Sequence, residues 1–155
     1  MKNVVKSEVS SYRTAISRSG PSAPLRHIES SLNKDDLILD YGCGKGADVK
    51  YLNDKGFTVD GYDPYYCNID LSCKNSYYDV VICNYVFNVL EKEKESDLMA
   101  SIVSKLKPGG RAYISVRRDS FEEGYTSRGY QRNVRFGNLP SFEKKGAFEL
   151  YFVTK

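Results

Sequence analysis

The sequence predicts an α/β fold: a doubly wound, mostly parallel sheet with helices on both faces. Two observations predict it. Short apolar runs typical of buried parallel strands recur along the chain, and they alternate with segments whose apolar residues follow helical spacing. The chain has 155 residues, which is enough for one domain with a hydrophobic core. We therefore expect a single domain over 1–155, with a polar N-terminal arm over 1–21.

The first half of the chain contains two expected helices and two expected strands. The segment 22–32 begins with a serine N-cap and has a proline in its first turn, which is typical of a helix start. The apolar run 36–40 is typical of a strand and leads into a glycine-rich loop at 41–46. A helix is expected over 47–56, where a glycine ends it, and a second strand over 57–63.

The second half continues the alternation. The run 79–83 predicts another buried strand, and a stripe of apolar residues over 98–106 predicts a helix. The tetrapeptide 107–110, Lys-Pro-Gly-Gly, is expected to end that helix before a strand at 111–116. Two further strands are expected on either side of a Lys-Lys-Gly turn, over 139–142 and 148–153.

Composition excludes several classes of protein. Hydrophobic residues make up 41% of the chain, and no apolar stretch approaches the ~20 residues of a membrane helix. The first residues lack the apolar core of a signal peptide, so we expect a cytoplasmic protein without a membrane partner. The four cysteines show neither CxxC pairs nor zinc spacing, and the chain has one histidine. We therefore expect reduced thiols and no metal.

Charge is unevenly distributed along the chain, although its formal net value is +3. Residues 105–155 carry 11 basic and five acidic side chains, whereas the middle of the chain is acidic. A basic C-terminal third is consistent with an anionic substrate or nucleic acid. An ordinary solvated surface would give the same asymmetry, so both interpretations stay open.

The glycine-rich loop between the first strand and its helix has two interpretations. Gly42, Gly44 and Gly46 let the backbone approach a ligand closely at a helix N-terminus. The segment fits the loose dinucleotide pattern GxGxxG/A, and Asp63 lies at the spacing of a ribose-binding carboxylate. A nicotinamide-dependent oxidoreductase is therefore one candidate.

Three details favour S-adenosylmethionine instead. Asp40 faces the loop from the tip of the first strand, where it would repel a pyrophosphate and attract an ammonium group. Asp63 is followed by Pro64, Tyr65 and Tyr66, which suit an adenosine. The Lys-Pro-Gly-Gly turn also precedes a strand late in the predicted sheet.

Four motifs together resemble those of class I S-adenosylmethionine-dependent methyltransferases. They span most of the chain: Leu39-Asp40-Tyr41-Gly42-Cys43-Gly44-Lys45-Gly46, Gly61-Tyr62-Asp63-Pro64, Asp79-Val80-Val81-Ile82-Cys83-Asn84-Tyr85-Val86 and Leu106-Lys107-Pro108-Gly109-Gly110. The resemblance implies a Rossmann-like fold. It also implies methyl transfer from S-adenosylmethionine by in-line displacement, with S-adenosylhomocysteine as the product.

The resemblance further implies roles for individual residues. Asp63 would accept both ribose hydroxyls, Asp40 would orient the methionine end, and the arm containing Arg18 would fold over the cofactor or acceptor. The expected cofactor contacts are Arg18, Asp40, Tyr41, Gly42, Cys43, Gly44, Gly46, Asp63, Pro64, Tyr65, Ile69, Asp70 and Asn84. The expected catalytic or acceptor-binding residues are Asn84, Tyr85, Asn88 and Arg128. Packing is the alternative role for Tyr85 and Asn88, and Cys43 is expected to be a small filler.

The segment between the second and third strands is too short for this family's usual pattern. Fifteen residues separate Asp63 from Asp79, whereas one crossover takes about a dozen residues and the family normally has two there. We therefore expect the edge strand after the second strand to be reduced or missing. Residues 68–77 are expected to form a loop or short helix over the adenine, with Ile69, Asp70 and Leu71 as contacts.

A narrower resemblance concerns the substrate. Segments 13–18, 84–89 and 125–129, together with Gln131, are similar to methyltransferases encoded beside DNA phosphorothioation genes. The segment 84–87 departs from the Asp/Asn-Pro-Pro-Tyr/Phe tetrapeptide of amino methyltransferases of DNA. We expect an unidentified acceptor, with DNA or RNA slightly preferred over a small molecule and a partner protein as a further aid to recognition. A noncatalytic cofactor-binding module is the alternative from another class.

Overall fold

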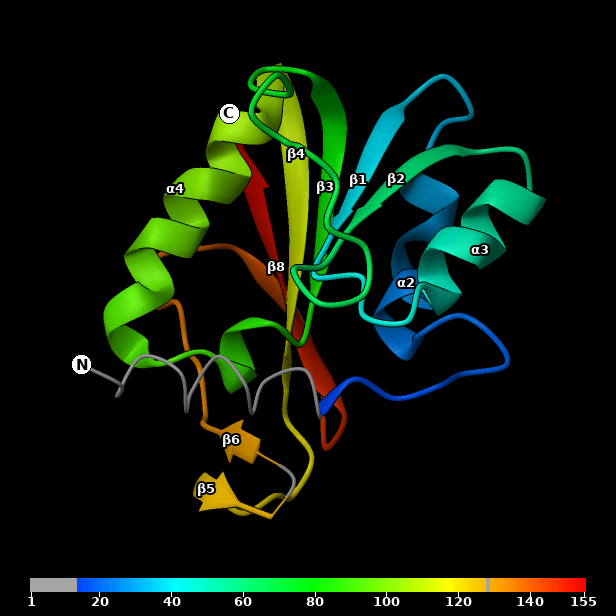
Figure 1. Ribbon diagram of the computed structural model, residues 1–155. Helices are drawn as coiled ribbons and strands as arrows, with labels where there is room; N and C mark the ends of the chain where they lie inside the picture. Colours follow the sequence, from blue (N-terminus) through cyan, green and yellow to red (C-terminus); the bar gives the residue numbers. More distant parts are fainter. Residues whose placement is uncertain (1–13, 128) are drawn as a thin grey trace.

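The computed structural model describes residues 14–127 and 129–155, and its main feature is a mixed sheet flanked by helices (Figure 1). The six strands of this sheet follow the order β2-β1-β3-β4-β8-β7. β1 (Leu37–Tyr41), β2 (Thr58–Tyr62), β3 (Tyr78–Asn84) and β4 (Leu106–Arg117) are parallel, whereas β8 (Phe148–Thr154) is antiparallel to both β4 and β7 (Ser141–Lys144). The expected α/β sheet, mixed and mostly parallel, is confirmed.

Helices cover both faces of the sheet (Figure 1). Ser22 begins the first of them as expected, because its side chain accepts the backbone N–H of Leu25 at 3.3 Å. α2 (Ala23–Ile28) and α3 (Ala47–Asp54) lie on one face, and α4 (Glu95–Lys105) lies on the other. The short 3-10 helices are η2 (Glu29–Ser31), η3 (Phe87–Val89) and η4 (Lys92–Lys94).

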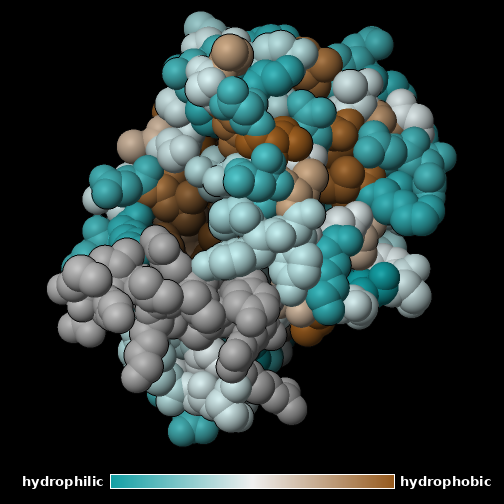
Figure 2. All heavy atoms as spheres, viewed as in Figure 1, coloured by the Kyte–Doolittle hydropathy of each residue, from teal (hydrophilic) through white to brown (hydrophobic). Residues whose placement is uncertain are grey.

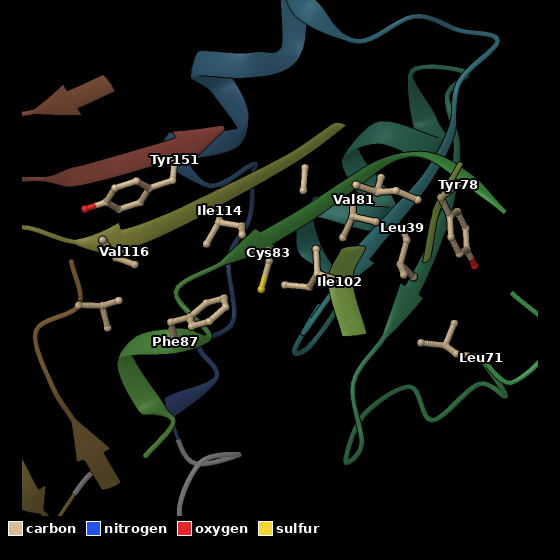
Figure 3. Close-up of a cluster of buried hydrophobic side chains, with 13 residues drawn as sticks. Leu39, Leu71, Tyr78, Val81, Cys83, Phe87, Ile102, Ile114, Val116 and Tyr151 are labelled. Carbon is tan, nitrogen blue, oxygen red and sulfur yellow. The ribbon is translucent and has the colours of Figure 1, made fainter. Parts of the chain in front are cut away.

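The hydrophobic core has two layers, one on each face of the sheet. On the α4 side, Ile102 of α4, Phe87 of η3 and Ile114 of β4 belong to one buried cluster (Figure 3). On the other side, Leu25 and Leu52 bring α2 and α3 against the strands. Burying a side chain of this size contributes roughly 1.5–3 kcal/mol, so the two layers hold the sheet in place. On the face that Figure 2 shows, apolar side chains of the coloured residues appear in gaps between hydrophilic ones.

The chain crosses from β2 to β3 without an intervening helix or full strand, so the expected loss of the edge strand is confirmed. β2 is an edge of the sheet, and the fully described segment 63–77 is a loop with a single bridge between Asp63 and Cys67. Lys105 holds this loop against the end of α4. Its ammonium group donates to the carbonyl of Leu71 at 3.1 Å and to Oδ1 of Asn75 at 2.8 Å.

Two segments differ from the sequence-based expectation. The tetrapeptide 107–110 does not separate α4 from the next strand, because β4 already begins at Leu106 and carries these residues as a bulge. Their backbone instead pairs with the C-terminus, where Gly109 and Gly110 exchange hydrogen bonds with Lys155. A short hairpin was not expected after β4. Its strands, β5 (Gly124–Thr126) and β6 (Gly129–Gln131), lie beyond the end of the sheet where β3 and β4 finish (Figure 1).

Candidate functional site

A cavity of about 1210 Å³ lies at the carboxyl ends of β1, β2 and β3. Asp40 near the end of β1, Asp63 directly after β2 and Asn84 at the end of β3 line it. Because β2 and β3 flank β1 on opposite sides, the strand order reverses here, and ligands of open α/β sheets bind at such a point. A typical single-ligand pocket has roughly 300–1,000 Å³, so this cavity has room for a cofactor and an acceptor together.

The glycine-rich loop adopts backbone conformations that a side chain would disfavour. Gly42, Gly44 and Gly46 have φ angles of +86°, +53° and +84°. A Cβ atom on Gly42 would lie 2.3 Å from Cγ2 of Val86, too close for any side chain. The backbone N–H of Gly42 also donates to the carbonyl of Tyr62 at 2.7 Å. The loop is therefore tied to β2 on one side and packed against the segment after β3 on the other.

Asp40 is the most deeply buried acid of the cavity. Its side chain lines the cavity and is 4% exposed, and no described residue donates a hydrogen bond to its carboxylate. Burial raises the pKa of this group well above its usual value of 3.8, and the negative charges of Asp48 and Asp63 raise it further. Arg18 opposes these effects. A cation bound at this position would relieve the repulsion between the carboxylates.

Asp63 connects the glycine-rich loop to the turn after β2. Its Oδ1 accepts the backbone N–H groups of Tyr65 and Tyr66, at 2.9 and 3.1 Å. Its Oδ2 accepts the N–H of Gly44 at 3.1 Å. Pro64 and Tyr65 line the cavity beside it. The carboxylate thus sets the shape of this part of the cavity wall.

Asn84 belongs to a polar network that the sequence patterns do not predict. Asp48, in the first turn of α3, accepts the backbone N–H and the hydroxyl of Ser22, each at 2.7 Å. Asn84 donates to Asp48 at 3.2 Å and to the hydroxyl of Ser22 at 3.3 Å, and it accepts the hydroxyl of Ser115 at 2.8 Å. An acidic residue in the first turn of a helix is common because it complements the helix dipole, so Asp48 carried no distinguishing signal.

Tyr85 lies at the point where the chain leaves β3, in a left-handed conformation with φ of 62°. This conformation costs a bulky residue roughly 1–3 kcal/mol and tends to occur at functional sites. The backbone N–H of Tyr85 donates to the carbonyl of Ser115 at 3.0 Å, and its partly buried side chain lines the cavity. Burial raises the pKa of the phenol, so its hydroxyl is neutral at physiological pH and suits positioning rather than general-base catalysis.

Asn88 does not line the cavity, in contrast to the catalytic role expected for it. The residue is fully buried. Its Nδ2 donates to the carbonyl of Arg132 and its Oδ1 accepts the N–H of Arg117, both at 2.9 Å. The side-chain nitrogen and oxygen of Asn88 are therefore both hydrogen-bonded to backbone groups. This arrangement supports the alternative role of Asn88 in packing.

Ile69 and Asp70 line a second cavity of about 460 Å³ rather than the main one. Tyr41 and Tyr62 line both cavities, and their rings meet edge-on with centroids 5.2 Å apart. The two cavities therefore share these two aromatic side chains as a common wall.

Some of the other expected site residues lie within the part of the chain that the structure describes, and some lie outside it. Arg18 is exposed and lines the main cavity, as does Cys43. Burial and then the charge of Asp40 raise the pKa of Cys43 to about 12, which fits a small filler rather than a nucleophile. Arg13 and Arg128 lie outside the described residues.

Across 14–127 and 129–155, no acidic, histidine or cysteine cluster could hold a metal, and no helix is long and apolar enough to cross a membrane.

Sequence comparison relates this chain to methyltransferases. Residues 15–149 match the family described as methyltransferase domain. Over 109 residues the chain is 31% identical to the ribosomal protein L11 methyltransferase of Paraburkholderia phymatum. That match covers 57% of this chain and 34% of the relative, so the chain spans about a third of the length of this curated protein.

Solved structures share the fold at low sequence identity. The 1,6-didemethyltoxoflavin-N1-methyltransferase of Burkholderia thailandensis, solved with 1,6-didemethyltoxoflavin and S-adenosylhomocysteine, aligns with a TM-score of 0.64 and 15% identity. The alignment covers 99% of this chain and 81% of that one. A TehB-like S-adenosylmethionine-dependent methyltransferase from Corynebacterium glutamicum aligns with a TM-score of 0.60 and 22% identity, over 99% and 100% of the two chains.

Proposed function

Because the chain belongs to the methyltransferase domain family, we propose that it transfers a methyl group from S-adenosylmethionine to an acceptor bound beside Tyr85. S-adenosylmethionine is the cofactor of this domain. When bound, it supplies a methyl group on a positively charged sulfur, which a nucleophilic atom of the acceptor attacks in line. The residues of this chain therefore need to align two molecules and exclude water, rather than supply a nucleophile.

The observation that carries this proposal is the buried carboxylate of Asp40, which has no hydrogen-bond donor among the described residues. With Asp48 and Asp63 nearby, it would attract the ammonium group of the cofactor and repel a pyrophosphate. Arg18 offers a positive partner for the cofactor's carboxylate at the same cavity. The electrostatics thus favour S-adenosylmethionine over a nicotinamide dinucleotide, the alternative that the glycine pattern left open.

We infer that Asp63 binds the ribose. An ionised carboxylate has roughly four acceptor positions, and three of those of Asp63 already receive backbone N–H groups. One ribose hydroxyl would donate to the remaining acceptor position. The second hydroxyl would donate to a carboxylate oxygen of Asp63 that also accepts the backbone N–H of Gly44 or Tyr65. Pro64 and Tyr65 would then face the adenosine, because they follow Asp63 along the same cavity wall.

We infer a small-molecule acceptor, and nucleic acid is the second candidate. The basic C-terminal third supports nucleic acid less than its sequence suggests, because a guanidinium neutralised within the protein adds little to phosphate binding. Five arginines of this segment are ion-paired internally: Arg111 with Asp36, Arg117 with Asp119, Arg118 and Arg135 with Glu149, and Arg132 with Glu95. The exposed rings of Tyr65 and Tyr125 are the observation that favours nucleic acid, since such rings stack on bases.

Two expectations about biological context stay predictions. None of the relatives named above is a protein of a DNA phosphorothioation system, so that association depends on the narrower motif resemblance alone. A partner protein that assists recognition likewise stays a prediction.

Two measurements test the proposed function. Titration calorimetry with S-adenosylhomocysteine and with NAD should show binding of the first and not of the second, and tight NAD binding would overturn the assignment. Methyl-tritiated S-adenosylmethionine should then label the low-molecular-mass fraction of a cell extract. Label in DNA or RNA would select the second candidate. Cofactor binding without transfer to any of these pools would favour the noncatalytic module.

A further inference from the structure

The β5–β6 hairpin contributes a polar group to the main cavity that has no partner. Gln131 is the last residue of β6, and it lines the cavity. Its Oε1 is buried and has no hydrogen-bond partner. Buried acceptors in native proteins are almost always paired, and an unpaired one is costly. Gln131 is therefore a residue of the cavity wall whose unpaired oxygen a ligand can satisfy once the side chain turns toward it.

The position of Gln131 is fixed by the residue that follows it. Arg132 exchanges two hydrogen bonds with Asn88, and its Nε donates to the carbonyl of Leu90 at 2.6 Å. Its guanidinium also pairs with Glu95 at 2.7 Å, at the start of α4. These contacts join the hairpin to η3 and α4. The backbone at Gln131 is therefore held in place beside the cavity.

The part of the cavity that adjoins these contacts is mostly apolar. Val89 of η3 and its neighbour Leu90 line it, together with Leu98 of α4. Lys94 of η4 also lines the cavity and has a partner of its own. Of the two arginines among the described residues that line the cavity, Arg117 is already neutralised by Asp119, to which it donates at 2.8 and 2.6 Å. A mostly apolar wall with an unpaired acceptor suits a neutral ligand that carries a hydrogen-bond donor.

We propose that Gln131 determines acceptor specificity by accepting a hydrogen bond from an N–H or O–H group of a neutral methyl acceptor. This inference rests on the proposed function and narrows its substrate class. A carboxylate or phosphate group offers no proton to Oε1, so an anionic acceptor would leave this oxygen unpaired. Gln131 takes no part in bond breaking, and its role is to orient the acceptor relative to Tyr85 and the cofactor.

A ligand-free measurement provides the first test. Gln131→Met keeps the length of the side chain and removes its polar atoms, so the variant should melt about 2–4 °C higher than the wild type in the absence of ligand. Asn133→Met is the matched control, because Asn133 is exposed, follows the hairpin closely and does not line the cavity. Its melting temperature should match that of the wild type. A Gln131→Met melting temperature equal to or below that of the wild type overturns the proposal.

Binding of matched probes provides the second test. Benzimidazole and indazole, each with its 1-methyl counterpart, are titrated by ligand-observed NMR against protein saturated with S-adenosylhomocysteine. At least one N–H probe should bind about tenfold more tightly than its methylated partner to the wild type and to Asn133→Met, and Gln131→Met should abolish this preference. Absence of any preference in the wild type overturns the inference. Failure to bind S-adenosylhomocysteine would instead count against the proposed function.

Discussion

Asn88 and Arg132 exchange two hydrogen bonds although 44 residues separate them in the chain. Asn88 Nδ2 donates to the carbonyl of Arg132 at 2.9 Å, and the N–H of Arg132 donates to the carbonyl of Asn88 at 2.8 Å. Asn88 Oδ1 also accepts the N–H of Arg117. One side chain therefore joins η3 to the ends of β4 and β6, which place Arg117 and Gln131 in the cavity wall.

Asn88→Ala should destabilise the protein. The substitution leaves the N–H of Arg117 and the carbonyl of Arg132 without their partner, and each unpaired buried group costs about 1–3 kcal/mol. We expect the free energy of unfolding in urea to fall by about 2–4 kcal/mol. Asn88→Asp should also destabilise the protein, because it keeps the acceptor for Arg117 but places a buried carboxylate against the carbonyl of Arg132. Unchanged stability combined with lost methyl transfer would contradict a positioning role and make Asn88 a catalytic residue.

Two glycines of the glycine-rich loop allow the effects of backbone strain and of steric crowding to be separated. Gly42 and Gly46 have nearly equal φ angles of +86° and +84°, so alanine suffers similar backbone strain at both, about 1–2 kcal/mol. The added Cβ meets Val86 at 2.3 Å in Gly42→Ala and no atom within 4 Å in Gly46→Ala. Overpacking costs a further 1–3 kcal/mol or so. Denaturant unfolding should show Gly42→Ala to be less stable than Gly46→Ala by about that amount, and equal stabilities would refute the crowding argument.

Local patterns in the sequence account for most of the fold, because they depend on spacing that is visible in one dimension. Apolar runs and periodicity predict the central strands and α4, and a serine followed by a proline two residues later predicts the helix start at Ser22, whose side chain accepts the N–H of Leu25. The missing edge strand followed from counting the residues between Asp63 and Asp79. Each of these inferences uses neighbours in sequence or the minimum length of a crossover.

The parts of the site that were missed depend on contacts between distant segments. Asp48 meets Ser22 and Asn84 across 26 and 36 residues, and no spacing rule connects these positions. The sequence points to Gln131 through the narrower motif resemblance alone, because its three-residue strand is too short for a periodic signal. The bulge at 107–110 likewise depends on Lys155, at the far end of the chain.

Asp40→Asn should change how stability depends on pH. In the wild type the folded-state pKa of Asp40 is raised, so between the usual value of 3.8 and that raised pKa the folded protein binds more protons than the unfolded one. The contribution of this group to stability is therefore full below pH 3.8 and is lost as pH rises through the folded-state pKa. Asn removes the buried charge, so the ligand-free variant should be more stable than the wild type at neutral pH.

Cofactor binding by Asp40→Asn should change in the opposite direction. The ammonium group of S-adenosylhomocysteine would lose its charged partner, which we expect to weaken binding by roughly 1.5–3 kcal/mol. Urea unfolding from pH 4 to 8 and calorimetry at neutral pH measure the two effects on the same samples. A variant that is destabilised without ligand and binds S-adenosylhomocysteine normally would show that Asp40 has a structural role instead.

Asp63→Ala should weaken S-adenosylhomocysteine binding by about 1–3 kcal/mol, through the loss of charge-assisted hydrogen bonds to the ribose. Asp63→Asn should rescue little, since its amide nitrogen cannot accept the N–H of Gly44 that Oδ2 accepts in the wild type. Asp70→Ala is the matched control, because Asp70 lines the second cavity and accepts the N–H of Ser72. Calorimetry should find its affinity close to that of the wild type. An equal loss in Asp70→Ala would place part of the cofactor in the second cavity, and normal binding by Asp63→Ala would refute the ribose contact.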